Sequence, residues 1–185
     1  TEFFRRANSI TKNDIATILY TSGTTGVPKG VVLTHTQILS EVSDAFPLLS
    51  ATADDIALSF LPYSHILGRI EIWGHIFTGH TLAFAESLEK IKQNLTEIRP
   101  TFMIAVPRIF EKIYAGVLTQ VGTNSIKSKL FHWALTIGTT VAHHRMKKEN
   151  IPLSLVAQYE LAKKLVLKKV TAAFGGRLRF AVSGG

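Results

Sequence analysis

The stretch Tyr20–Gly30, with the sequence YTSGTTGVPKG, combines hydroxyl groups, glycines and one cation between two apolar runs. Gly23, Gly26 and Gly30 allow positive φ and close backbone approach, so successive N–H groups can turn inward around an anion. Lys29 supplies a point charge for phosphate oxygens. The hydroxyl donors are Thr21, Ser22, Thr24 and Thr25. This set of groups predicts a phosphate-binding loop, because a plain glycine-rich hairpin turn would not explain so many hydroxyls.

The spacing within this loop differs from that of the two common nucleotide-binding motifs. A Walker A loop has the pattern GxxxxGK[ST], with a helix that begins at the lysine. Here the first two glycines are three residues apart, Lys29 is followed by Gly30 rather than by a hydroxyl, and a β-branched run comes next. The GxGxxG pattern of a Rossmann site is also missing from the loop. The loop therefore belongs to another class of phosphate site.

Short apolar and β-branched runs alternate with amphipathic stretches along the chain. Strands are expected at residues 16–22, 30–35, 55–62, 80–85, 101–106 and 175–183. Helices are expected at residues 35–46, 64–79, 87–99, 107–121 and 124–173, the last one broken at 149–152. This alternation predicts an α/β fold with a mostly parallel sheet flanked by helices. Because ligands bind beyond the carboxyl ends of such strands, we expect the loop and the terminal SGG to form one shared site.

Several helix ends carry residues that commonly begin a helix. Thr34 and Ser87 are expected to cap the helices that follow them, and Pro107 suits the first turn of its helix. One apolar face of the last helical stretch is formed by Val156, Tyr159, Ala162, Val166 and Val170. Leu161 and Leu165 lie on the opposite face, so we expect this helix to be covered on two sides.

The composition predicts a globular chain, since 46% of its 185 residues are hydrophobic and only 18% are charged. It has no cysteine, which excludes disulfides and thiolate metal sites. No apolar run approaches the roughly 18 residues of a membrane-spanning helix and no signal peptide is evident, so a cytoplasmic location is expected. The net charge of +8 could attract phosphates or an anionic membrane surface. The alternative is that this is a partial chain whose lysines simply keep the helix faces solvated. Aromatic residues do not alternate with the lysines, so no nucleic-acid partner is expected.

The stretch YTSGTTGVPKG resembles the signature of the AMP-forming adenylate synthetases, which include acyl-CoA synthetases, adenylation domains of nonribosomal peptide synthesis and beetle luciferases. The resemblance implies that the loop holds the β- and γ-phosphates of ATP while a carboxylate attacks the α-phosphorus. The products would be an acyl-adenylate and pyrophosphate. The implied ligands are Thr21, Ser22, Gly23, Thr24, Thr25, Gly26, Lys29 and Gly30.

Three further stretches extend this resemblance over nearly the whole chain. SFLPYSHILGRIE at 59–71 resembles the second core segment of the superfamily. VPRIFEKIY at 106–114 and GGRLRFAVSGG at 175–185 resemble the long-chain fatty acyl-CoA synthetase branch, and the long helical insert between them also fits that branch.

The resemblance implies roles for one histidine and for two glycines. It places His65 beside the acyl carboxylate, where a neutral imidazole orients the substrate and later the thiol; the alternative is that His65 only caps a helix. Gly184 and Gly185 would border the adenine and acyl pocket, with a plain turn as the alternative. Arg108 stands in a first helical turn, where a cation opposes the helix dipole, and this mismatch hints at a salt bridge or a phosphate contact. No protein metal site is predicted.

The resemblance also implies that residues 1–185 are a single partial domain, taken from the large N-terminal domain of a fatty-acid–CoA ligase. The intact enzyme would use ATP, Mg²⁺ and CoA with a fatty acid and could associate with the inner face of a membrane, whereas its oligomeric state is not predicted. The mobile C-terminal lid domain and other required motifs are expected outside this chain, so the chain alone is expected to be inactive. Two alternatives stay open: adenylation of an aromatic or amino acid, and a nucleotide- or anion-binding module without catalysis.

Overall fold

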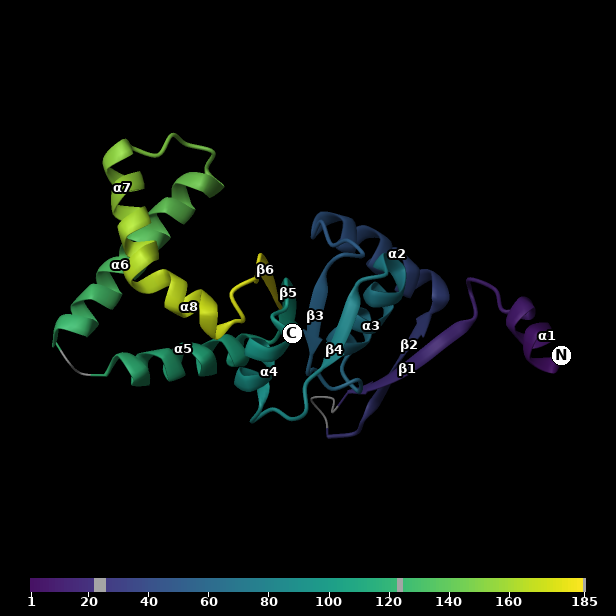
Figure 1. The fold of residues 1–185 in the computed structure, drawn as a ribbon. Coiled ribbons are helices and arrows are strands. Elements are labelled where there is room, and N and C mark those ends of the chain that lie inside the picture. Colours follow the sequence, from purple (N-terminus) through teal and green to yellow (C-terminus); the bar gives the residue numbers. More distant parts are fainter. Residues whose placement is uncertain (22–25, 123–124, 185) are drawn as a thin grey trace. The chain divides into compact units, whose positions relative to one another are not determined.

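The computed structural model describes residues 1–21, 26–122 and 125–184 of the chain (Figure 1). The chain divides into two compact units, Thr1–Ala85 and Glu86–Gly185. Each unit contains a pair of parallel strands together with helices. The expected α/β class with parallel strands is therefore confirmed.

The first unit begins with a helix and an antiparallel hairpin and continues with a parallel strand pair. Its elements are α1 (Glu2–Ser9), β1 (Ile15–Thr21), β2 (Lys29–Thr34), α2 (His35–Leu48), β3 (Ile56–Ser59), α3 (Ile66–Thr78) and β4 (Thr81–Phe84). β1 and β2 form a two-stranded sheet of their own. The expectation that the loop follows a strand of the parallel sheet was wrong. The link at 22–28 is short, and parallel pairing needs a crossover of a dozen or more residues, so the two strands can only pair antiparallel.

The parallel pair of the first unit is β3 with β4, joined through α3. Ala57, Leu58 and Ser59 are buried in β3. α2 begins with the N-cap expected at Thr34, whose Oγ1 accepts from the N–H of Gln37, and the Gln37 side chain completes a capping box. The helix continues through Pro47 to Leu48, two residues beyond the expected end.

α2 packs closely against α3 at one glycine. Gly74 in α3 lies against the ring of Phe46, which is 1% exposed, and a Cβ at position 74 would overlap that ring. Gly74 therefore serves the packing of two helices, although glycine has a low helix propensity. α3 ends at Gly79, whose φ of 75° is the left-handed conformation that suits glycine at a helix C-terminus.

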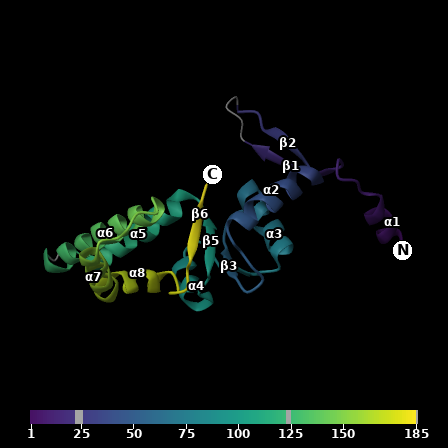
Figure 2. The same cartoon turned by 90° about the horizontal axis from the view of Figure 1, so that it is seen from above.

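The second unit combines a parallel strand pair with several helices (Figure 2). Its elements are α4 (Ile91–Ile98), β5 (Phe102–Ala105), α5 (Pro107–Val121), α6 (Ser125–Met146), α7 (Leu153–Ala162), the π-helical turn η1 (Lys163–Leu167), α8 (Lys168–Ala173) and β6 (Phe180–Ser183). Pro107 occupies the first turn of α5, as expected. Ser87 does not cap α4 directly, because that helix begins after Lys90.

The core of the helical part lies between α6 and α7. Ala134, Ile137 and Ala162 are buried there, and Trp133 and Tyr159 pack against them. The expectation that this helical stretch is covered on two sides was wrong: Leu161 is 51% exposed and Leu165 is 41% exposed. Among the described residues, no helix is long and apolar enough to cross a membrane.

Candidate functional site

The β1–β2 hairpin positions both ends of the phosphate loop. Thr21 pairs with Lys29 and Tyr20 pairs with Gly30, so Lys29 stands directly where the chain re-enters the hairpin. Thr21 and Lys29 are exposed, and Lys29 has no ion pair with any carboxylate in the part of the chain that the structure describes. Its ammonium group is therefore available to an anion.

The two described glycines of the loop have different physical roles. Gly26 has a φ of 77° with open space around it, which is the backbone freedom expected for an anion-binding turn. Gly30 is not among the described residues with positive φ. A Cβ at Gly30 would lie 3.0 Å from Cγ2 of Ile18 and 3.4 Å from Cε1 of Tyr20. A side chain at position 30 would thus make tight contacts with two exposed side chains of the hairpin, and an unusual φ is not what favours glycine there.

Five of the predicted site residues lie outside the described residues. They are Ser22, Gly23, Thr24, Thr25 and Gly185.

His65 caps the N-terminus of α3. Its Nδ1 accepts a hydrogen bond from the N–H of Leu67 at 3.3 Å, and the side chain is exposed. A neutral imidazole that accepts at Nδ1 carries its proton on Nε2. The capping role is therefore confirmed, and it uses Nδ1 and leaves Nε2 outside this hydrogen bond. The role of His65 beside an acyl carboxylate stays a prediction.

Arg69 connects the hairpin to the segment that holds His65, a role that no motif in the sequence indicated. Its Nε donates to the carbonyl oxygen of Tyr63 at 2.7 Å, and its Nη1 donates to Oγ1 of Thr17 in β1. The guanidinium thus bridges the strand before the phosphate loop and the turn before the histidine. The only signal in the sequence was a cation within the apolar stretch HILGRIEIW.

Glu71 is a buried carboxyl group at the centre of α3. Its side chain is 0% exposed, and neither carboxyl oxygen has a hydrogen-bond partner among the residues described. Burial raises the pKa of Glu71 to about 7, against a smaller lowering by the nearby Ser59 hydroxyl. That hydroxyl bonds instead to the phenol of Tyr63, with Oγ and Oη 3.0 Å apart. The turn that leads to His65 is therefore next to two buried polar groups, the Ser59 hydroxyl and the Glu71 carboxyl.

In the second unit, Gly184 lies where two parallel strands end. Its N–H donates to the carbonyl oxygen of Ala105 at 3.4 Å, which extends the β5–β6 pairing by one step. Arg108 is exposed in the first turn of α5 and forms no ion pair with the described residues. The salt bridge considered for Arg108 is thus not found among them, and its phosphate contact stays a prediction. The expectation of one shared site also stays a prediction.

We expect Arg69→Met to destabilise the chain by about 2 kcal/mol, because it removes two hydrogen bonds from a charged donor. Urea unfolding measures the change. Thr17→Val removes one acceptor with little change in shape, so the two substitutions form a double-mutant cycle. A coupling free energy indistinguishable from zero would show that Arg69 does not connect β1 to α3.

We expect the free energy of unfolding to fall by about 3 kcal/mol through Glu71 as the pH rises from 4.5 to 7, because the folded chain holds a proton that the unfolded chain has released. Glu71→Gln keeps a neutral side chain and should remove this contribution, so the variant gains stability relative to the wild type at pH 8. Urea midpoints at pH 5 and pH 8 measure this difference.

The control for Glu71 must separate it from other titrating groups. Burial lowers the pKa of His80 to about 4, so His80 adds stability above pH 6.5 and loses it as the pH falls. That contribution is the same in the wild type and in Glu71→Gln. Glu41→Gln, an exposed change on α2, should leave the pH dependence unaltered. An equal pH dependence in all three proteins would contradict the assignment to Glu71.

Comparison with known proteins places these features in a family context. The profile of the family described as AMP-binding enzyme matches residues 3–185. Long chain acyl-CoA synthetase 6, peroxisomal, of Arabidopsis thaliana is 34% identical over 93% of this chain and 23% of its own length. The long-chain-fatty-acid–CoA ligase FadD15 of Mycobacterium tuberculosis is 34% identical over 100% of this chain and 31% of its own length. The chain thus spans about a quarter to a third of the curated relatives it matches.

Two solved structures share the fold of part of the chain. The N-terminal domain of FACL13 from Mycobacterium tuberculosis is 31% identical with a TM-score of 0.52, covering 56% of this chain and 26% of that one. The o-succinylbenzoate CoA synthetase of Bacillus subtilis is 26% identical with a TM-score of 0.53, covering 58% of this chain and 22% of that one.

Proposed function

Because the chain belongs to the AMP-binding enzyme family, we propose that it forms the phosphate-binding part of an ATP-dependent fatty-acid–CoA ligase. The observation that carries this proposal is the exposed Lys29 at the exit of the hairpin loop, on a hairpin that Arg69 connects to the segment of His65. The fatty-acid substrate is proposed because two relatives are named as long-chain acyl-CoA synthetases or ligases, and their similarity covers nearly the whole of this chain.

In the first proposed step, the carboxylate of a fatty acid attacks the α-phosphorus of ATP and pyrophosphate leaves. A carboxylate is already ionised at pH 7, so no general base is required. The main requirement is to neutralise charge on the leaving phosphates, which the backbone N–H groups of the loop and Lys29 would supply. Mg²⁺ would arrive bound to the phosphates of ATP. The Nε2–H of His65 would donate to the carboxylate and hold it for attack.

In the second proposed step, the thiol of CoA attacks the carbonyl carbon of the acyl-adenylate. The bond between the carbonyl carbon and the phosphate oxygen of AMP breaks, the thiol proton is released to solvent, and acyl-CoA and AMP are formed. His65 would again hold the acyl group in position, and Gly184 would border the acyl pocket. We propose that the complete enzyme works in the cytoplasm, peripherally at the inner face of the membrane, since the net charge of +8 would attract an anionic surface.

We expect Lys29→Met in the complete ligase to lower kcat/KM for ATP–pyrophosphate exchange by about 100-fold, the usual cost of losing one group that stabilises transition-state charge. Exchange of labelled pyrophosphate with palmitate as substrate measures this. Lys12→Met, which removes an exposed lysine before β1, is the matched control. Equal activity of the two variants would remove the loop lysine from the mechanism.

The 185-residue chain alone is expected to form no measurable acyl-CoA, because we propose that the lid domain and other required motifs lie elsewhere in the complete enzyme. A thioester assay with palmitate, ATP, Mg²⁺ and CoA checks this. Acyl-CoA formation by the isolated chain would refute this part of the proposal.

A second candidate is adenylation of an aromatic carboxylate, and the likeness to the o-succinylbenzoate CoA synthetase favours it. Pyrophosphate exchange with palmitate, benzoate and an amino acid separates the substrate classes.

A third candidate is a nucleotide-binding module without catalysis. Titration of the chain with ATP, using Lys29→Ala as the comparison, tests whether the loop binds the nucleotide at all.

A further inference from the structure

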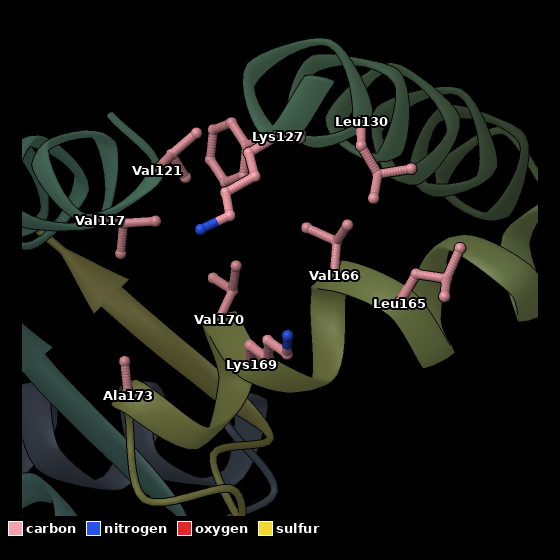
Figure 3. Close-up of a pocket in the computed structure, with 10 residues that line it drawn as sticks. Val117, Val121, Lys127, Leu130, Leu165, Val166, Lys169, Val170 and Ala173 are labelled. Atoms are coloured by element: carbon pink, nitrogen blue, oxygen red, sulfur yellow. The ribbon is translucent and has the colours of Figure 1, made fainter. Parts of the chain in front are cut away.

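The helical part of the second unit contains a cavity of about 300 Å³ that the proposed reaction does not use. It lies between the end of α5, the start of α6 and the stretch formed by η1 and α8 (Figure 3). Its walls are mainly apolar and include Val117, Val121, Leu130, Phe131, Val166 and Val170. None of the candidate phosphate-binding or catalytic residues that the structure describes lines it.

One wall of the cavity depends on the π-helical turn η1. Leu165 and Val166 belong to this turn, and Lys169, Val170 and Ala173 follow on the same face in α8. Single π-helical turns within a longer helix often mark functional sites. Leu165 remains 41% exposed and Leu130 remains 36% exposed, so these apolar side chains are only partly covered.

Two exposed lysines from different helices line this apolar cavity. Figure 3 shows the amino group of Lys127 directed toward Val117 and Val170, and the amino group of Lys169 directed toward Val166. The described residues that line the cavity include no acidic one. Neither lysine forms an ion pair with any of the residues described. The site thus offers two cations beside an apolar wall and no anion of its own.

We propose that this cavity binds a single-chain anionic amphiphile, with the alkyl chain against the apolar walls and the anionic head group between Lys127 and Lys169. The two ammonium groups select the charge, because a cationic head group would be repelled and a neutral one would leave both lysines without a partner. The volume lies at the lower end of ligand-binding cavities, which suits one alkyl chain rather than a two-chain lipid. This inference does not rest on the proposed ligase function.

The test is a titration of the 185-residue chain with laurate below its micelle concentration. The chain has two tryptophans, so Trp73→Phe leaves Trp133 as the only indole. Trp133 and Val166 both pack against the α6–α7 core, which makes Trp133 fluorescence a reporter close to the cavity. We expect a saturable change with laurate and none with dodecyltrimethylammonium, which has an equally long chain and the opposite charge.

Variants assign the binding to the two lysines. We expect Lys127→Met with Lys169→Met to weaken laurate binding at least tenfold. Lys129→Met with Lys168→Met removes the same charge from neighbouring lysines that are equally classed as exposed but do not line the cavity, and it should bind like the wild type. Equal weakening in both double variants would show only a general charge effect and would overturn the proposal.

A filled cavity gives an independent check. Val170→Phe should abolish laurate binding while the circular dichroism spectrum stays unchanged; if this variant does not fold, the lysine pair still decides. The proposal fails if laurate does not bind the wild-type chain. It also fails if light scattering shows a dimer that Val170→Phe dissociates, because a second copy would then cover the cavity.

Discussion

The guanidinium of Arg69 holds together the parts of the first unit that carry the candidate chemistry. It donates at once to a side chain of the hairpin and to the backbone of the turn before His65. An antiparallel pair on its own is only marginally stable in water, so a hairpin needs contacts of this kind to hold its loop in place. A charged donor suits this position, because its hydrogen bonds are stronger than those of a neutral group and keep their direction.

The buried polar groups near the turn before His65 lower the free energy of unfolding, because burial removes them from water. A carboxyl group as deeply buried as that of Glu71 is stable mainly in its neutral form, and an apolar residue would be less expensive there. Such groups concentrate where a protein performs chemistry. The hydrogen bond between Ser59 and Tyr63 lies beside this carboxyl group, and Tyr63 also makes an edge contact with Phe84 in β4. The turn before His65 is therefore held from two strands.

The second unit contains a largely apolar helical stretch that remains half exposed. Its α6–α7 side is a conventional core, whereas the opposite side opens into a cavity with two lysines. Long lysine side chains can cover apolar surface while keeping their charge accessible. In the stretch LAKKLVLKKV, Lys169 lines this cavity, whereas Lys163, Lys164 and Lys168 are exposed and do not line it.

The sequence alone determined what depends on neighbouring residues: the helix cap at Thr34, the start of α5 at Pro107, and the alternation of strands and helices. Local signals suffice there, because caps and turns act within a few residues. Only the tertiary structure decided which strands pair, that Gly30 lies close to Ile18, and that Leu165 faces a cavity instead of a second layer. Arg69 and Glu71 belong to the same group, since a hydrogen bond to Thr17 and the loss of solvent depend on residues distant in the sequence. Those contacts arise only when the chain has folded, and for that reason no local pattern could reveal them.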